Sequence, residues 1–281
     1  MFGTSPKRSR NALAVVTGAG SGIGAAFAVE LARRGGRVVC SDIDEVAAAR
    51  TAETIADHGG SAIAMRCDVS RVDDVSRLAT DAREWFAAAP TLVVNNAGVG
   101  AGGSAVGDLS IEDWSWVLGI NLWGPIHGCH VFAPILRGAG YGGIVNVASA
   151  AAFGAAPNMA AYNVSKAGVL SLSETLAAEL SGTGVNVTVL CPTFVKTNIV
   201  ESGRITARSS DVANTLMRWT GLSAQRVART CLNTHDRGGL YCMPQFDARI
   251  GWGVKRFAPS AYTRAVGLVA RAGTSVRATT S

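Results

Sequence analysis

Three side chains at fixed spacing carry groups that could move a proton. Tyr162 is followed four residues later by Lys166 and preceded thirteen residues earlier by Ser149. Residues at i and i+4 share one helix face, so Tyr162 and Lys166 can project side by side. A neighbouring ammonium lowers the pKa of a phenol from about 10 toward the range useful for general acid–base chemistry. With Ser149 donating a hydrogen bond to a carbonyl or alkoxide oxygen, this set suits proton transfer to or from a substrate oxygen.

A glycine-rich segment near the N-terminus supplies a context for that chemistry. It reads Thr17-Gly-Ala-Gly-Ser-Gly-Ile-Gly24, between the apolar run 12–16 and a helix-like stretch at 25–34. A strand, a glycine turn and a helix form a dinucleotide-binding loop, in which phosphates lie at the helix N-terminus. Gly18 permits the tight turn, Gly22 lets the backbone approach the pyrophosphate, and Gly24 allows close helix–sheet packing.

Together these motifs resemble the short-chain dehydrogenase/reductase (SDR) family, from about residue 13 to residue 197. The glycines have that family's G-x-x-x-G-x-G spacing. The resemblance implies a single Rossmann-like, doubly wound parallel β-sheet of about seven strands with helices on both faces. It also implies two sets of site residues. The catalytic residues are Asn121, Ser149, Tyr162 and Lys166. The cofactor-binding residues are Thr17, Gly18, Ser21, Gly22, Ile23, Gly24, Asp42, Ile43, Asp68, Val69, Asn95, Ala97, Gly98, Tyr162, Lys166, Pro192, Val195 and Thr197.

The resemblance assigns roles to several of these positions. Asp68 and Val69 frame the adenine, and the segment 95–98 supports the sheet beside the cofactor. Asn121 holds a water that links Lys166 to solvent as a proton relay. Thr197 hydrogen-bonds the nicotinamide carboxamide.

The charge at the end of the second expected strand favours NAD over NADP as cofactor. Asp42 follows the run 37–41 and should accept hydrogen bonds from the adenosine ribose hydroxyls while repelling a 2′-phosphate. Relatives that prefer NADP usually carry Arg or Lys just before the second motif glycine or just after this strand. Here Ser21 and Ile43 occupy those places.

Alternating apolar runs and helical stretches favour one parallel sheet with crossover helices. The expected strands are Ala12–Val16, Arg37–Ser41, Ala62–Cys67, Leu92–Asn95, Gly143–Ala148, Val185–Leu190 and Gly239–Cys242. We expect a basic N-terminal tail at 1–11, a catalytic domain at 12–248 and a basic amphipathic extension at 249–281.

Composition excludes several other classes of protein. No apolar stretch approaches the ~20 residues that span a bilayer, and no signal-type segment is visible, so a cytoplasmic protein is expected. The six cysteines lack metal-binding spacing and are interpreted as reduced structural residues, and His127 and His130 lack metal-binding partners. No motif typical of nucleic-acid binding accompanies the basic residues.

The excess positive charge lies in the last 33 residues. The whole chain has a formal net charge of +6, and residues 249–281 contain six Lys or Arg and no acid. Apolar residues at helical spacing, with Pro259 between them, predict two short helices. Three alternatives remain open for this extension: packing on its own subunit or a neighbour, peripheral contact with anionic lipid, or a lid or basic rim for an anionic substrate such as an acyl thioester of coenzyme A.

The substrate is less well defined by the sequence. Val99, Phe153, Met159 and Phe194 stand near the expected reacting centre, and an apolar wall suits a steroid, terpenoid or fatty-chain compound, although the same residues could serve core packing. In relatives, the segment corresponding to 198–225 covers the substrate. The family usually has Pro-Gly where this chain has Pro192-Thr193, which places the shape of that loop in question.

The sequence therefore predicts an NAD(H)-dependent oxidoreductase that interconverts a secondary alcohol and a ketone, acting as a homodimer or homotetramer as relatives commonly do. The alternative is a non-catalytic NAD-binding sensor or scaffold that uses the basic extension for partner or membrane contact.

Overall fold

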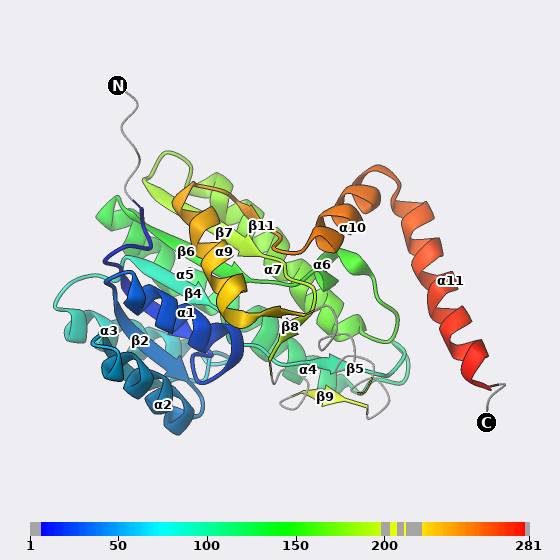
Figure 1. Ribbon diagram of the computed structural model, residues 1–281, viewed down its shortest axis with the longest axis horizontal. Helices are drawn as coiled ribbons and strands as arrows, with labels where there is room; N and C mark the ends of the chain where they lie inside the picture. Colours follow the sequence, from blue (N-terminus) through cyan, green and yellow to red (C-terminus); the bar gives the residue numbers. More distant parts are fainter. Residues whose placement is uncertain (1–6, 198–202, 207–210, 212–220, 279–281) are drawn as a thin grey trace.

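A computed structural model describes residues 7–197, 203–206, 211 and 221–278, with side chains as far as residue 271. Within these residues the chain forms an α/β fold around one seven-stranded sheet (Figure 1). The strand order is β11-β7-β6-β4-β1-β2-β3, and every pair is parallel. The predicted doubly wound Rossmann-like architecture is confirmed.

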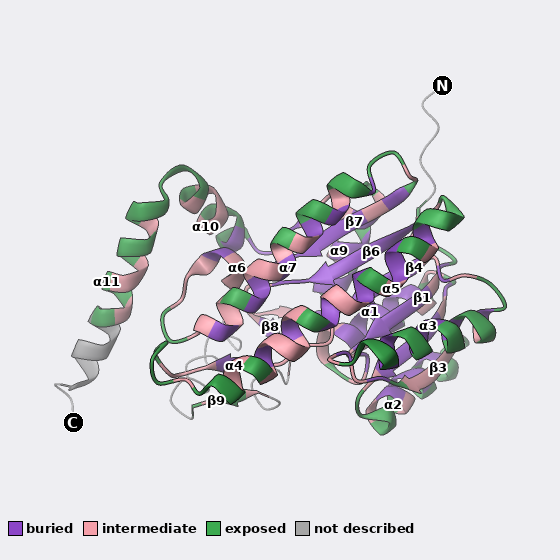
Figure 2. Ribbon diagram, turned by 180° about the vertical axis from the view of Figure 1, so that it is seen from behind, coloured by how far each residue is buried: buried purple, intermediate pink, exposed green. Residues whose placement is uncertain are grey.

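The strands of this sheet lie within two residues of the predicted bounds. They are β1 (Leu13–Thr17), β2 (Arg37–Asp42), β3 (Ser61–Arg66), β4 (Leu92–Asn95), β6 (Gly142–Val147), β7 (Val185–Leu190) and β11 (Tyr241–Cys242). Most of their side chains are buried because helices cover both faces of a parallel sheet (Figure 2).

Six helices form the two covering layers. One layer contains α1 (Gly22–Arg33), α2 (Glu45–Asp57) and α9 (Ala224–Asp236), and the other contains α3 (Val72–Phe86), α5 (Gly124–Ala139) and α7 (Ala160–Glu179). Neighbouring strand residues alternate between these layers, as side chains of a strand must. Val16 packs into the α1 layer, whereas Val15 packs into the α7 layer.

Shorter elements follow the ends of the strands. Two small parallel pairs join β5 (Ala101–Gly102) to β9 (Arg204–Ile205) and β8 (Val195–Lys196) to β10 (Leu222–Ser223). The helices are α4 (Ile111–Leu118), the π-helical segment Gly119–Trp123 that joins it to α5, and α6 (Ala151–Gly154). The elements β5, α6 and β8 follow the carboxyl ends of β4, β6 and β7, where open α/β sheets bind their ligands.

Two helices end the described chain. They are α10 (Phe246–Phe257) and α11 (Pro259–Ala278), and α11 extends away from the sheet (Figure 1). The predicted division at Pro259 is confirmed, because this proline begins the second helix. The boundary expected between residues 248 and 249 falls inside α10. Among the described residues, no helix combines the length and apolar character needed to cross a membrane.

The described cysteines are all buried and free of disulfides, as expected for structural thiols.

A histidine is also buried in the core of the fold. His235 on α9 is fully buried, and its Nδ1 lies 2.9 Å from Thr188 Oγ1, which itself donates to the Gly239 carbonyl oxygen. Nε2 has no hydrogen-bond partner among the described residues, and a Cβ added at Gly143 would lie 2.0 Å from it. This arrangement fits a neutral imidazole, and burial lowers the pKa of His235 to about 4.

We expect the fold to lose stability on mild acidification because of His235. Its pKa is about 4 in the fold and 6.5 when unperturbed, so between these values the unfolded chain binds a proton that the folded chain does not. The free energy of unfolding should therefore fall by about 2 kcal/mol between pH 7 and pH 5. Urea unfolding at both pH values measures this change.

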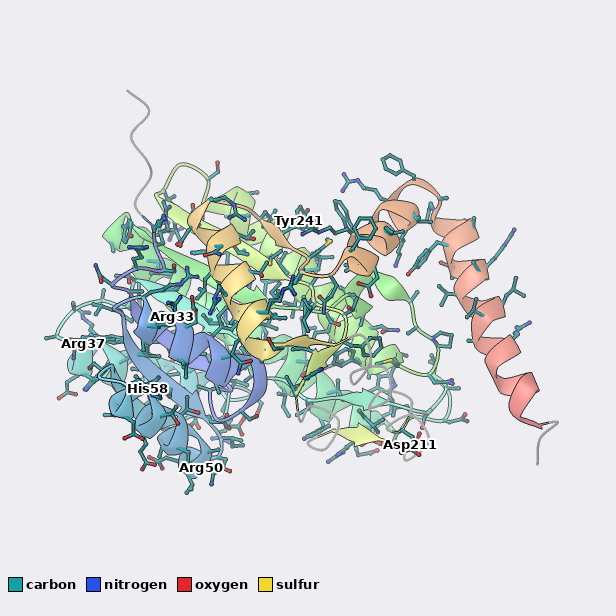
Figure 3. The ribbon with its side chains drawn as sticks, in the orientation of Figure 1. Arg33, Arg37, Arg50, His58, Asp211 and Tyr241 are labelled. Atoms are coloured by element: carbon teal, nitrogen blue, oxygen red, sulfur yellow. The ribbon has the colours of Figure 1, made fainter. Side chains whose placement is uncertain are left out.

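Two variants isolate the contribution of that imidazole. His235→Gln should be less stable at pH 7 but should show a clearly smaller further loss at pH 5. His58→Gln removes an exposed histidine at the end of α2 and serves as the control for loss of a histidine outside the core (Figure 3). An equal pH dependence in wild type and His235→Gln would contradict the assignment.

Candidate active site

The carboxyl ends of the central strands surround a cavity of about 610 Å³. Most of the predicted site residues line it, although they come from loops far apart in the chain. The predicted residues in the lining are Gly18, Ser21, Gly22, Ile23, Asp42, Ile43, Asp68, Val69, Ala97, Gly98, Ser149, Tyr162, Lys166, Pro192, Val195 and Thr197. Thr17, Gly24, Asn95 and Asn121 are absent from the lining.

The glycine loop has the shape that a bound phosphate requires. Gly18 and Gly22 have φ values of +64° and +56°, which glycine adopts without strain. A Cβ at Gly18 would lie 2.7 Å from the Ala97 Cα, so a side chain there would collide with backbone. At the N-terminus of α1, Ser21 makes no side-chain cap and the first turn holds no acid. The N–H groups there are available to an anion, and these residues fit a dinucleotide pyrophosphate.

Asp42 closes the other end of the glycine loop. Its Oδ2 accepts a hydrogen bond from the Gly20 backbone N at 2.9 Å, and its Oδ1 accepts one from Asp44 N at 3.1 Å. The carboxylate therefore lies against the loop at the end of β2, with Ile43 beside it in the cavity lining. This is where a ribose carrying free hydroxyls would be bound and a 2′-phosphate repelled.

Thr17 and Gly24 support the cavity from behind. Thr17 Oγ1 accepts hydrogen bonds from the backbone N of Asn96 at 3.0 Å and of Ala97 at 3.2 Å. A Cβ at Gly24 would lie 2.0 Å from the Gly18 carbonyl oxygen. The two residues hold the loops after β1 and β4 together, and their expected contribution to cofactor binding stays a prediction.

Asn95, which was expected to contribute to the cofactor site, is absent from the cavity lining, and its role there stays a prediction. Its Nδ2 donates to Asn146 Oδ1 at 2.8 Å, inside the layer of α5 and α7. Asn96, which the sequence analysis passed over, lines the cavity, and its Nδ2 donates to the Thr17 carbonyl oxygen at 2.9 Å. Adjacent residues at a strand end point to opposite sides. The paired asparagines were the available signal, but the sequence did not show which one faces the cavity.

The three proton-transfer candidates meet at the cavity wall. Tyr162 and Lys166 lie on α7, as their spacing predicts, and Ser149 follows β6. Lys166 Nζ is 5.7 Å from the centre of the Tyr162 ring and donates to the Val147 carbonyl oxygen at 3.0 Å. The Ser149 hydroxyl lies close enough to Tyr162 to lower the pKa of the phenol, and its Oγ donates to the Pro192 carbonyl oxygen at 3.4 Å. Its Oγ also accepts from Ala151 N at 3.1 Å, which fixes the hydroxyl beside the phenol.

The pKa of Tyr162 shifts in the direction opposite to the one expected from sequence. Removal of water raises the pKa of this phenol, and the hydrogen bond with Ser149 opposes that rise. Burial lowers the pKa of the Lys166 ammonium to about 8. Both shifts have the same cause, because a site shielded from water disfavours the charged form of each group.

Asn121 lies behind Lys166 in the π-helical segment, a distortion that is frequent at functional sites. Its Oδ1 accepts from Val99 N at 2.8 Å and its Nδ2 donates to the Val99 carbonyl oxygen at 2.9 Å. A Cβ at Gly98 would lie 3.0 Å from Asn121 Oδ1 and 3.4 Å from Lys166 Nζ. Gly98 therefore permits the close approach of both side chains, and the water relay through Asn121 stays a prediction.

The part of the cavity beyond Tyr162 is apolar. Val99, Phe153, Met159 and Phe194 all line it, as the sequence analysis predicted. Among the described lining residues, Lys166 is the one basic side chain. The cavity wall thus gives no support to a basic rim for an anionic substrate. Most of the expected substrate cover at 198–225 lies outside the described residues.

The C-terminal helices complete this apolar part, a placement that the sequence left among several alternatives. Asp247, Ala248 and Gly251 of α10 and Tyr262 of α11 line the cavity. The Tyr262 hydroxyl donates to the Gly154 carbonyl oxygen at 3.3 Å, which connects α11 to α6. The inner side of the extension therefore packs on its own chain, the first of the three alternatives.

Thr193 connects the loop after β7 to the start of α10. Its backbone N donates to Gln245 Oε1 at 3.3 Å, and its Oγ1 donates to Asp247 Oδ1 at 3.4 Å. Gln245 Nε2 donates in return to the Phe194 carbonyl oxygen at 2.9 Å. The residue that departs from the family pattern thus contributes a hydroxyl contact that glycine would lack.

Comparison with curated proteins gives several relatives. "Probable oxidoreductase EphD" of Mycobacterium tuberculosis is 42% identical over 200 residues, which are 71% of this chain and 33% of that protein. The chain thus matches only about a third of the length of EphD. The "1-deoxy-11-beta-hydroxypentalenate dehydrogenase" of Streptomyces exfoliatus is 34% identical over 84% of each chain.

Solved structures agree with the fold. A short-chain dehydrogenase/reductase from Burkholderia phymatum in complex with NAD has a TM-score of 0.83 and 36% identity, covering 89% of this chain and 94% of that chain. A short-chain dehydrogenase from Sphingobium yanoikuyae in complex with NADPH has a TM-score of 0.76 and 28% identity, covering 88% and 93%. The family model described as short chain dehydrogenase matches residues 12–207. The family model, the fold and the relatives agree with one another. The chain therefore belongs to the short-chain dehydrogenase/reductase family of oxidoreductases.

Proposed function

We propose that this chain is an NAD(H)-dependent oxidoreductase that interconverts hydrophobic secondary alcohols and ketones. The observation that carries the proposal is that Tyr162, Ser149 and Lys166 meet at one cavity wall. This wall lies between the glycine loop and the apolar part of the cavity beyond Tyr162, which we call the apolar chamber. A large apolar cavity with a few convergent polar groups is the form that small-molecule sites take. The Streptomyces relative, named for a hydroxypentalenate, supports an alicyclic or terpenoid substrate.

Each residue of the proposed site has its own role in proton transfer. A bound nicotinamide dinucleotide supplies hydride donation and acceptance at its C4. The Tyr162 phenol donates its proton to the carbonyl oxygen during reduction and takes it back during oxidation. Ser149 donates a hydrogen bond that stabilises negative charge on that oxygen. Lys166 holds the ribose of the cofactor and favours the phenolate, and Asn121 supports the proton path behind it.

The proposed preference for NAD(H) rests on Asp42. Solved relatives bind NAD or NADPH, so family membership alone leaves the choice open. The carboxylate of Asp42 at the end of β2 supports NAD(H), because it would repel a 2′-phosphate.

We also propose a cytoplasmic homodimer or homotetramer. Trp123, at the start of α5, is 52% exposed, and Val164 on α7 is 48% exposed. Large apolar side chains that face solvent on these helices support contacts between subunits there.

The function is tested by following the absorbance of reduced nicotinamide with both cofactors and a panel of hydrophobic alcohols and ketones. Turnover that prefers NAD(H) is expected. Absence of turnover across the panel, with NADH binding shown by fluorescence, would instead favour the non-catalytic sensor or scaffold.

Replacing Thr193 with glycine should weaken substrate binding moderately. The change removes the hydroxyl contact with Asp247 and loosens the loop that anchors α10, a wall of the apolar chamber. A net hydrogen bond contributes about 1 kcal/mol, so KM for the best panel substrate should rise about threefold to fivefold. Thr193→Ser keeps the hydroxyl and should keep the wild-type KM. Equal KM values in the two variants would show that this contact does not shape the site.

A further inference from the structure

The outer face of α10 carries a row of large apolar side chains that the described part of the chain leaves exposed. We define this outer face as Phe246, Ile250, Val254 and Phe257, of which Phe257 is 89% and Phe246 74% exposed. At 3.6 residues per turn, the four positions fall within an arc of about 80°. The opposite side of the same helix faces the cavity through Ala248. One side of the helix therefore packs toward the cavity, whereas the outer face is exposed (Figure 2).

Basic residues lie along one edge of the outer face, and Asp247 in the first turn of α10 is the acid beside the other edge. Arg249 and Arg256 project from one edge of the row, as the helical spacing requires. The Arg256 guanidinium lies 5.3 Å from the centre of the Trp252 ring, and Arg249 Nε donates to the Met243 carbonyl oxygen. From residue 249 to the end of the sequence there is no Asp or Glu. The surface is thus both apolar and positively charged.

The apolar row and its basic edge distinguish between two kinds of partner, a second copy of the chain and a lipid surface. A contiguous exposed apolar row marks an interaction site. A twofold contact between two antiparallel copies of the outer face would bring the arginine edge of one copy toward the arginine edge of the other, away from Asp247. An anionic lipid surface offers acyl chains for the apolar row and phosphate oxygens for the arginines. Charge complementarity therefore favours lipid.

We propose that the outer face of α10 docks on an anionic membrane surface, with the helix axis in the plane of the interface. Gly251 and Ala248 on the other side of α10 line the apolar chamber. Docking would therefore place the chamber next to the bilayer, where an apolar alcohol is concentrated. This consequence for the substrate rests on the proposed function, whereas the docking itself does not.

Vesicle flotation tests the docking with the full chain. Vesicles of phosphatidylcholine alone are compared with vesicles that also contain phosphatidylglycerol. The wild type should float with the anionic vesicles and should be released by high salt. Changing all four outer-face residues to glutamine should lower the partition coefficient at least about a hundredfold, because each loses its apolar contact with lipid. Arg249→Gln combined with Arg256→Gln should lower it about thirtyfold.

A matched variant controls for general loss of surface hydrophobicity. Val106→Gln with Ile111→Gln removes two other exposed apolar side chains, 66% and 73% accessible, far from α10 in sequence. This variant should float like the wild type. Circular dichroism and NADH binding confirm that each variant is folded, so a loss of flotation is separable from a failure to fold.

Three results would overturn the proposal. They are equal flotation of wild type with neutral and anionic vesicles, undiminished flotation of the fourfold glutamine variant, and equal loss in the Val106/Ile111 control. A wild type that ignores vesicles but forms an oligomer that the fourfold variant disrupts would assign the outer face to a second copy. Turnover of a water-soluble ketone by the fourfold variant is measured in parallel, so failure of docking and failure of the proposed reaction are distinguished.

Discussion

Tyr162→Phe is expected to reduce kcat by about a hundredfold to ten-thousandfold, the range of a lost general acid–base group. The variant keeps the ring on α7 and removes only the hydroxyl that Ser149 contacts. Proton delivery to the carbonyl oxygen then has no donor of suitable position. Because the phosphate-binding loop is untouched, NADH should bind with nearly wild-type affinity, as fluorescence titration would measure.

Tyr241→Phe is the matched control for this experiment. Its hydroxyl donates to Glu174 at 2.7 Å, and the residue lies outside the cavity lining, on β11 (Figure 3). Loss of that hydroxyl should leave kcat unchanged. Retention of more than about a hundredth of the wild-type turnover by Tyr162→Phe would reject Tyr162 as the acid–base group.

Asp42→Asn should shift the cofactor preference from NAD(H) toward NADP(H) by about a hundredfold in the ratio of kcat/KM values. The substitution keeps one amide oxygen that can accept from Gly20 N, whereas the contact with Asp44 N is lost because an amide nitrogen cannot accept. It removes a negative charge from the place of a 2′-phosphate. Two unit charges about 4 Å apart near a protein surface interact by about 4 kcal/mol, enough for a change of this size.

Asp44→Asn tests whether any nearby carboxylate would have the same effect. Asp44 caps α2 by accepting from Ala47 N at 3.0 Å and is exposed, two residues from Asp42. This variant should keep the helix cap, because Asn caps a helix about as well as Asp, and should leave the cofactor ratio within about twofold of wild type. A ratio in Asp42→Asn that moves less than about tenfold would mean that another feature sets the preference.

The pKa values connect these residues to the pH of the reaction. A raised pKa keeps the Tyr162 phenol protonated near neutrality, the state needed to reduce a carbonyl. With a pKa of about 8, Lys166 loses its charge as the pH rises above that value. The phenolate that oxidation requires is then supported mainly by Ser149. The pKa of Tyr162 therefore depends on its burial and on Ser149 as well as on its i, i+4 spacing from Lys166.

Local sequence was sufficient for much of the fold and part of the site. The glycine segment, the carboxylate after β2 and the Tyr162–Lys166 pair are each set by neighbours within one strand, turn or helix. Their backbone conformations follow from residue type, as the positive φ values of Gly18 and Gly22 show. The sheet strands were equally predictable, because buried parallel strands are short apolar runs.

Tertiary structure alone decided which side chains share an environment. It turned Asn96 toward the cavity and Asn95 away from it, since a strand end faces two layers that sequence does not distinguish. It buried Tyr162 and Lys166 together and so reversed the expected pKa shift of the phenol. It also brought Thr193 into contact with Gln245 and Asp247, which lie 52 and 54 positions later in the chain, and it made α10 a wall of the cavity. Such contacts depend on packing between distant segments, and local spacing carries no information about them.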